Sequence, residues 1–186
     1  MEALRLPDLD DLDGLITRDE GERLAHLASL VPAGEAIVEI GAYTGQSSCY
    51  LARGAQEGHG AEVHSVDLWD LGGQKHSAKY AQASVLATFH RQTTAAGVAV
   101  VPHRCSSVDA ASGWTGPKVG MLFVDGMHTY GGVMSDLHAW TPHLAADAWV
   151  VWHDYCDRFP GVIRAVDEWA GERDRLHHDR LLAVRR

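Results

Sequence analysis

The chain has 186 residues, which suits one domain that can fold without disulfides or a structural metal, and its three well-separated cysteines include no C-x-x-C pair. The formal net charge of −9 argues against nucleic acid as a partner, because nothing compensates for repulsion by the phosphates. No apolar run approaches the roughly 18 to 20 residues of a membrane span, and the N-terminus lacks the pattern of a signal peptide, so we expect a cytoplasmic protein with no membrane partner.

The N-terminal part of the chain predicts an acidic leader followed by a helix. We place the leader at residues 1–17, where aspartates are interleaved with leucines, and a single domain over residues 18–186. Thr17 and Glu20 have the spacing of a capping box, and leucines then recur at helical intervals. A first helix is therefore expected over about residues 18–31.

Strand-like and helical segments then alternate along the chain in the order that builds a doubly wound sheet. The expected strands cover residues 36–40, 62–66, 98–102, 119–124 and 148–152, and the expected helices cover residues 46–53, 77–96, 130–141 and 161–170. Continuous apolar runs are typical of strands that are covered on both faces. The predicted fold class is therefore α/β, with a mostly parallel, Rossmann-like sheet and helices on both faces.

The residues after 170 predict a shortened C-terminal edge of the sheet. Basic residues collect there, but Asp174 and Asp179 interrupt them, so the segment is either a solvated tail or an edge strand. Only one further strand is expected, over residues 181–184, where two are usual for this fold. A second copy of the chain could complete the edge, so we expect a homodimer.

The turn after the first strand has the features of a ligand-binding loop. Gly41 and Gly45 allow a tight turn and the close approach of a ligand, and the next helix offers free N–H groups to a carboxylate or phosphate. The G-x-x-x-G spacing differs from the G-x-G-x-x-G of dinucleotide-binding folds, which disfavours a nicotinamide oxidoreductase. An ordinary strand-to-helix turn would also explain these glycines.

Polar and aromatic residues follow the second and third strands, where ligands of such sheets bind. Asp67 is positioned to accept both hydroxyls of a ribose, although a cap or loop carboxylate would explain it too. Trp69 could cover an adenine or belong to the core. Ser106 offers a hydroxyl where adenine would lie, and a helix cap is an equally good account of it.

Two carboxylates follow the fourth and fifth strands. Asp125 and Asp154 come from neighbouring strand ends, so they should lie close together. Their oxygen atoms suit a hard divalent cation such as Mg²⁺, and His153 or Asp157 could supply a further contact. Taken alone, an aspartate at a strand end is often only a cap.

The segment from Val38 to Gly45, followed by Val66 and Asp67, resembles the first two motifs of class I S-adenosylmethionine (SAM) methyltransferases. It is especially similar to catechol and caffeoyl-coenzyme A O-methyltransferases, and to macrocin-type and mycinamicin-type sugar O-methyltransferases. The resemblance covers about residues 35–155 and implies SAM as cofactor. The cofactor-binding residues that we expect on this basis are Glu39, Gly41, Tyr43, Thr44, Gly45, Ser47, Asp67, Trp69, Ser106 and Asp125.

The same resemblance implies a metal-dependent reaction. The metal-dependent enzymes of both groups have an aspartate after the fourth strand and a general base three residues later, which gives Asp125 a metal role and His128 the base role. Their fifth strand ends in an acidic residue followed by Asp or Asn, so Asp154 matches fully and His153 imperfectly. A softer ion, or a site of two carboxylates and water, therefore stays open as an alternative.

These residues together predict a metal-dependent O-methyltransferase that acts on a hydroxyl of a small polar acceptor. A sugar or glycoside is favoured because His128 resembles the base of the sugar enzymes, where catechol enzymes use lysine. A catechol-like phenol is one alternative acceptor, and a non-catalytic cofactor-binding subunit is an alternative of another class. The leader and the glycine-containing residues 72–76 could close over the acceptor as a lid.

Overall fold

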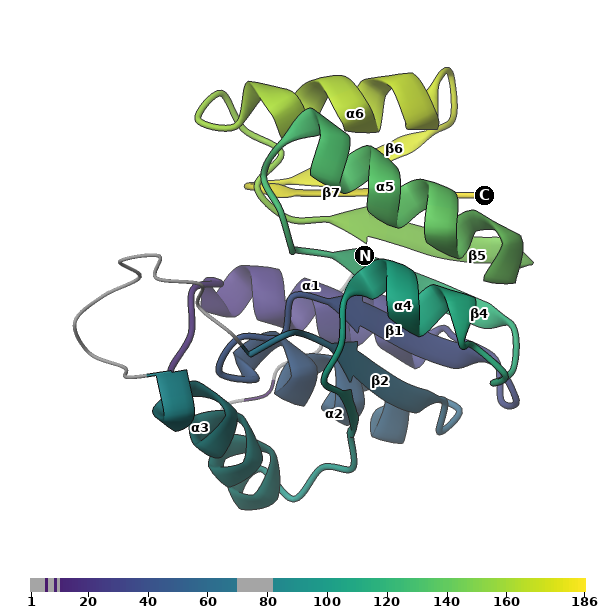
Figure 1. Ribbon diagram of the computed structural model, residues 1–186. Helices are drawn as coiled ribbons and strands as arrows, with labels where there is room; N and C mark the ends of the chain where they lie inside the picture. Colours follow the sequence, from purple (N-terminus) through teal and green to yellow (C-terminus); the bar gives the residue numbers. More distant parts are fainter. Residues whose placement is uncertain (1–5, 7–8, 10, 70–81) are drawn as a thin grey trace.

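Seven strands form one sheet in the order β3-β2-β1-β4-β5-β7-β6 in the computed structural model of the chain (Figure 1). The structure describes residue 6, residue 9, residues 11–69 and residues 82–186. Strands β1 to β5 pair in parallel, whereas β7 runs antiparallel to both β5 and β6. The predicted α/β fold with a mostly parallel sheet is confirmed.

Helices and strands alternate along the chain as far as α6, and a two-stranded hairpin follows. The strands are β1 Ala36–Ile40, β2 Glu62–Val66, β3 Val101–His103, β4 Val119–Val124, β5 Leu144–Trp152, β6 Arg175–His178 and β7 Leu181–Arg185. The helices are α1 Arg18–Ser29, α2 Gln46–Glu57, α3 Gln82–Ala95, α4 Ser107–Ser112, α5 Tyr130–Trp140 and α6 Pro160–Ala170, with a 3-10 turn η2 at Thr141–His143.

The sheet is buried between two helical layers. Side chains alternate along each strand, so Ile37 joins the apolar core beneath α1 and α2, while Val38 joins the core beneath α4, α5 and α6. A smaller cluster includes Trp69 and Phe89, the latter from α3. Covering both faces explains why the central strands are continuous apolar runs, and it leaves the carboxyl edge of the sheet for polar side chains.

Several predicted boundaries differ from the observed ones. The third strand covers residues 101–103 and not 98–102, because the backbone N–H of Val98 donates to the carbonyl of Thr93 and closes the end of α3. Helix α4 was not predicted, and β5 begins earlier than expected, at Leu144. The predicted helical residues 77–81 and the glycine-containing residues 72–76 lie outside the described residues.

The prediction of a shortened C-terminal edge is wrong. Two strands, β6 and β7, complete this side of the sheet. Strand β6 escaped prediction because Arg175, His177 and His178 give it no apolar pattern, as suits an edge strand whose side chains are largely exposed. The sequence-based argument for a homodimer rested on a missing strand, so this argument no longer holds.

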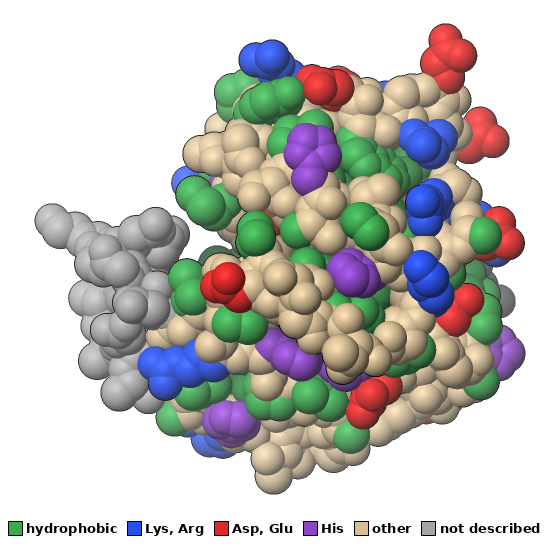
Figure 2. All heavy atoms as spheres, turned by 45° about the vertical axis from the view of Figure 1, so that its right-hand side comes forward, with side chains coloured by type: hydrophobic (Ala, Val, Ile, Leu, Met, Phe, Trp, Pro, Cys, Tyr) green, Lys and Arg blue, Asp and Glu red, His purple; other side chains and the backbone are tan. Residues whose placement is uncertain are grey.

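The surface of the described residues carries mixed charges. On the face that Figure 2 shows, basic and acidic side chains are interspersed.

None of the described helices combines the length and the apolar character needed to cross a membrane.

Candidate active site

The carboxyl ends of β1 and β4 approach each other closely at Gly41. This glycine has a φ of +91°, and a Cβ added to it would lie 2.2 Å from the backbone oxygen of Asp125. The backbone N–H of Asp125 also donates to the carbonyl of Ile40. Gly41 is therefore required to bring the glycine turn and the fourth strand end together.

The N-terminus of α2 offers backbone donors at this edge. Gly45 is its N-cap residue, with a φ of +90°, and among the described residues no side chain caps the helix. A Cβ at Gly45 would lie 2.8 Å from the ring of Phe89, so glycine is favoured here by space as well as by conformation. Uncapped N–H groups at a helix N-terminus suit a carboxylate or phosphate.

The carboxylate of Asp67 is fixed beside this turn. It accepts hydrogen bonds from the backbone N–H of Tyr43, at 2.9 Å, and from that of Trp69, at 2.6 Å. The indole N–H of Trp69 in turn donates to the carbonyl of Tyr43 at 2.9 Å. Trp69 is only 1% exposed and packs edge-on against Phe89, so in the structure its indole belongs to the core, the alternative that the sequence left open.

Glu39 lies behind the glycine turn, fully buried. Its carboxylate accepts hydrogen bonds from the hydroxyls of Ser47, Ser48 and Ser65. Burial raises the pKa of Glu39 to about 7, although the three hydroxyls act in the opposite direction. The side chains of Glu39 and Ser47 therefore hold α2 against β1 and β2.

Two other predicted cofactor residues also have protein partners. The hydroxyl of Thr44 donates to the carbonyl of Asp13, at 2.5 Å, which ties the leader to the glycine turn. Gln92 of α3 binds both the N–H and the carbonyl of Asp13. Ser106 is the N-cap of α4 and accepts from the N–H of Asp109 at 3.1 Å, so it has the capping role that the sequence gave as its alternative.

Asp125, His128 and Asp154 meet at the ends of β4 and β5. The Nε2 atom of His128 lies 2.8 Å from Oδ2 of Asp154 and 3.9 Å from Oδ1 of Asp125. One ligand atom from each of the three residues lies within 4.8 Å of the others. Two carboxylates and an imidazole at this spacing fit a divalent cation. The sequence predicted that Asp125 and Asp154 lie close together, and the structure places them so. His128, predicted as the base, lies in the same cluster, and His153, predicted as a further metal contact, lies beside both carboxylates.

His153 lies deeper than this cluster, on the side of α1. Its Nδ1 atom is 3.2 Å from Oδ1 of Asp125 and 3.5 Å from Oδ1 of Asp154. Its Nε2 atom faces Oε1 of Glu20 at 3.4 Å. The imidazole therefore lies between the site carboxylates and a buried carboxylate of α1.

Sequence reasoning missed two charged residues near the site, Glu20 and Arg180. The guanidinium of Arg180 lies 2.9 Å from Oε2 of Glu20 and 3.3 Å from Oδ1 of Asp154. Glu20 was recognised only as a capping residue, and Arg180 only as part of a basic C-terminal segment. No local pattern relates the two, because 160 residues separate them along the chain.

Pairing of opposite charges controls the ionisation of this site. Hydrogen bonds with Asp125 and Asp154 raise the pKa of His128 to about 9. Burial alone lowers the pKa of His153, but three neighbouring carboxylates outweigh it and raise this pKa to about 11. Burial raises the pKa values of Asp154 and Glu20, but contacts of the opposite effect outweigh it. The imidazoles of His128 and His153 hold the pKa of Asp154 below the usual range, and His153, the N–H of Thr17 and Arg180 together lower the pKa of Glu20 to about 2. At neutral pH, ionised carboxylates are thus paired with protonated imidazoles.

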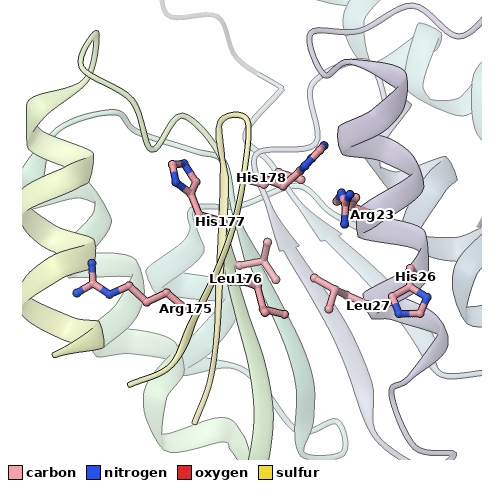
Figure 3. Close-up of a pocket in the computed structure, with 10 residues that line it drawn as sticks. Arg23, His26, Leu27, Arg175, Leu176, His177 and His178 are labelled. Atoms are coloured by element: carbon pink, nitrogen blue, oxygen red, sulfur yellow. The ribbon is translucent and has the colours of Figure 1, made fainter. Parts of the chain in front are cut away.

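A groove of about 410 Å³ lies apart from this edge, between α1 and the β6–β7 hairpin (Figure 3). Leu27 and Leu176 extend into it from opposite sides, and Arg23 and His178 point toward each other across it. None of the site residues predicted from the sequence lines this groove. The groove is therefore separate from the residues that meet at the ends of β4 and β5.

Comparison with known proteins identifies the family. Residues 38–155 match the family described as methyltransferase domain, and the chain belongs to it. No curated protein matches the sequence. The membership agrees with the prediction from the glycine turn and Asp67.

Solved structures share the fold at low sequence identity. The chain is similar to the O-methyltransferase TomG from Streptomyces achromogenes in complex with SAM, with a TM-score of 0.72 and 19% identity over 98% of this chain and 91% of TomG. It is similar to the O-methyltransferase from Bacillus cereus in complex with S-adenosylhomocysteine (SAH), with a TM-score of 0.67 and 16% identity over 96% of this chain and 85% of that one. CalS11, a TDP-rhamnose 3′-O-methyltransferase of calicheamicin biosynthesis, gives a TM-score of 0.64 and 13% identity over 89% of this chain and 77% of CalS11.

Proposed function

We propose that this methyltransferase transfers a methyl group from SAM to a hydroxyl of a small polar acceptor, with the help of a divalent cation such as Mg²⁺. The observation that carries the proposal is the convergence of Asp125, His128 and Asp154 at the same sheet edge as the glycine turn and Asp67. Methyl transfer to a hydroxyl needs a donor site and a means of removing a proton side by side, and this edge offers residues for both.

The donor site has two features that suit SAM. The uncapped N-terminus of α2 can receive the carboxylate of the methionine moiety, and Asp67 can accept the ribose hydroxyls. Glu39, Ser47 and Thr44 act indirectly in this proposal, because their side chains already hold the turn in shape. The structures of TomG and the Bacillus cereus enzyme are complexes with SAM and SAH, respectively.

Asp125 and Asp154 are the proposed cation ligands, because their oxygens face one another across a short distance and suit a hard ion. When bound, a divalent cation neutralises these carboxylates and lowers the pKa of a neighbouring hydroxyl. His128 has a raised pKa only because the same two carboxylates surround it. Once their charge is neutralised, the pKa of the imidazole falls toward its ordinary value, and His128 can accept a proton.

The reaction balances with these groups. The acceptor oxygen attacks the sulfonium methyl in line, the new C–O bond forms as the C–S bond breaks, and the hydroxyl proton moves to Nε2 of His128. The products are the methyl ether, SAH and a proton. Orientation of the oxygen and methyl about 3 Å apart supplies much of the acceleration, and general base catalysis adds roughly 10²- to 10⁴-fold.

A sugar or glycoside is the proposed acceptor, ahead of a catechol-like phenol. CalS11, named as a TDP-rhamnose 3′-O-methyltransferase, shares the fold, although at 13% identity. The sequence resemblance of His128 to the base of sugar enzymes favours the same class.

We keep the homodimer as a separate prediction, which sedimentation velocity of the purified chain would check.

The test combines calorimetry with a methyl-transfer assay on a panel of glycosides and catechols. We expect SAM binding, Mg²⁺-dependent turnover of a glycoside, and a loss of about 10²- to 10⁴-fold in kcat for His128→Gln with SAH affinity unchanged. His138→Gln is the matched control, because His138 is exposed in the last turn of α5. Cofactor binding without metal dependence or turnover would instead support the non-catalytic subunit.

A further inference from the structure

The charges that surround Asp125 and Asp154 extend past the cation ligands into α1 and the β6–β7 hairpin. The side chain of Glu20 is fully buried and that of His153 is 3% exposed. Buried ionic groups are costly unless each has a partner. The partners of these two are each other, the site carboxylates and Arg180.

One carboxylate oxygen of Glu20 faces one ring nitrogen of His153. Oε1 of Glu20 and Nε2 of His153 are buried atoms without a hydrogen-bond partner among the described residues, and they face each other at 3.4 Å. The opposite ring atom, Nδ1, faces Oδ1 of Asp125 at 3.2 Å. Glu20 thus lies at one end of the imidazole, and the cation-site carboxylates lie at the other.

Arg180 provides a second connection between α1 and the site. One nitrogen of its guanidinium donates to Oε2 of Glu20 at 2.9 Å and to the carbonyl of Leu15 at 3.2 Å, while the other donates to Oδ1 of Asp154 at 3.3 Å. A planar guanidinium holds such partners in fixed directions. Of the two oxygens of Asp154, Oδ1 is held by Arg180, and Oδ2 contacts His128.

The position of Glu20 is itself fixed by the start of α1. Its Oε2 atom accepts from the backbone N–H of Thr17 at 2.8 Å, and the hydroxyl of Thr17 accepts from the N–H of Glu20 at 3.2 Å. This reciprocal capping box leaves Oε1 directed toward His153. Glu20 and Arg180 both lie outside residues 38–155, which match the family.

We propose that Glu20 and Arg180 are positioning residues of the cation site: Glu20 orients His153 against Asp125 and Asp154, and Arg180 fixes the carboxylate of Asp154. The inference rests on the proposed function, because it assumes that Asp125 and Asp154 hold a divalent cation. Residues that orient metal ligands from outside the ligand set commonly change metal affinity by about 10- to 100-fold when substituted.

The test is a titration of the purified protein with Mn²⁺, in the presence of SAH, followed by electron paramagnetic resonance of the free ion. Glu20→Gln is the main variant, because glutamine keeps the size of the side chain and can still complete a capping box. Glu22→Gln is the matched control, since Glu22 lies two residues further along α1 and pairs with Arg18 instead. We expect Glu20→Gln to bind Mn²⁺ about 10-fold more weakly and Glu22→Gln to bind as the wild type does.

Arg180→Lys gives an independent test that does not depend on the folding of the α1 variant. Lysine keeps the charge but cannot contact Glu20 and Asp154 together, so we again expect weaker Mn²⁺ binding. Arg175→Lys is its control on the same hairpin, because Arg175 pairs with Asp167. SAH affinity and thermal unfolding, measured on each variant, separate positioning from a general loss of structure.

Each outcome decides a different question. If Glu20→Gln and Arg180→Lys bind Mn²⁺ with wild-type affinity, the positioning proposal is wrong while the cation site stands. If they lose thermal stability or SAH affinity in proportion to Mn²⁺ affinity, their role is structural and the proposal is again wrong. If the wild-type protein binds SAH but no Mn²⁺, the metal part of the proposed function fails and the positioning proposal fails with it.

Discussion

At the scale of single residues, the active-site edge combines groups whose ionisation depends on their neighbours. Asp154 has a φ of +57°, in the left-handed region that few residues other than glycine adopt, and it contacts both His128 and Arg180. Strain of this kind persists where surrounding contacts hold the residue in place, and it is frequent at functional sites. Glu39 is the opposite case, a carboxylate that burial makes hard to ionise.

Glu39 predicts a measurable dependence of stability on pH. Its pKa is about 7 in the folded chain, against an ordinary value of 4.5. Because the folded value is the higher one, the stabilising contribution of the protonated form is complete below about pH 4.5 and is lost as pH rises through 7. Glu39→Gln removes this titration, so we expect its free energy of unfolding, relative to that of the wild type, to be larger at pH 8 than at pH 5, which means that the variant is relatively more stable at pH 8.

Urea denaturation of the two proteins at both pH values checks this prediction. The amide oxygen of glutamine can replace one of the two carboxylate oxygens, while its NH2 group replaces the other and can donate to a serine hydroxyl. This change in hydrogen bonding is present at both pH values, so the pH dependence of the difference isolates the charge. An equal difference at pH 5 and pH 8 would mean that Glu39 ionises in the folded chain as easily as in the unfolded one. Glu172→Gln, at an exposed position after α6, controls for general charge effects.

At the scale of elements, the glycine turn joins β1 to α2 in a conformation that side chains resist. For Gly45→Ala we expect the free energy of unfolding to fall by about 1–2 kcal/mol or more. The left-handed conformation is unfavourable for alanine, and its Cβ would also clash with the ring of Phe89. We also expect weaker SAH binding, since the N-terminus of α2 must shift. Thermal unfolding and calorimetry with SAH measure the two effects.

Gly60→Ala is the matched control for this element. Gly60 also has a positive φ, +74°, but a Cβ there meets nothing within 4 Å, and the residue follows the C-terminal end of α2. We expect the Gly60→Ala variant to have a lower free energy of unfolding, through backbone strain alone, and to bind SAH with wild-type affinity. Equal losses of SAH affinity in both variants would contradict a specific role for the α2 N-terminus.

The elements also explain what the sequence predicted and what it did not. Strands β1, β2 and β4 were predicted at their observed bounds, because buried strands are short runs of apolar or β-branched residues between turns. Asp125 and Asp154 were placed correctly because each follows such a strand. Strand β6 was missed because an exposed edge needs no apolar pattern. Glu20 and Arg180 were missed because only tertiary packing brings α1 and the β6–β7 hairpin to the site.

At the scale of the whole molecule, binding at one edge should stabilise the entire sheet. A ligand that binds only the folded chain adds about 2.7 kcal/mol at 100 times its Kd. For a domain of this size, that corresponds to a rise in Tm of roughly 5–11 °C. We therefore expect saturating Mg²⁺ to raise the Tm and EDTA to reverse the change, as measured by differential scanning calorimetry.

A variant and its control test whether Asp125 is a ligand of the cation in that experiment. Asp125→Asn should abolish the Mg²⁺-dependent rise, because it removes a proposed ligand without a large change in volume. Asp147→Asn should keep it, since Asp147 is exposed on β5 away from the site. A rise of equal size in both variants would mean that Mg²⁺ binds somewhere else.

The attachment of the leader has a consequence for how the sequence can vary. Gln92 and Thr44 bind position 13 through its main-chain N–H and carbonyl, which every amino acid except proline provides. Substitutions at position 13 can therefore keep these main-chain hydrogen bonds, whereas most substitutions of Gln92 remove the side-chain amide that forms two of them. A mutational scan that covers the leader and α3 should find proline excluded at position 13, because it lacks the N–H, and position 92 intolerant of side chains without an amide.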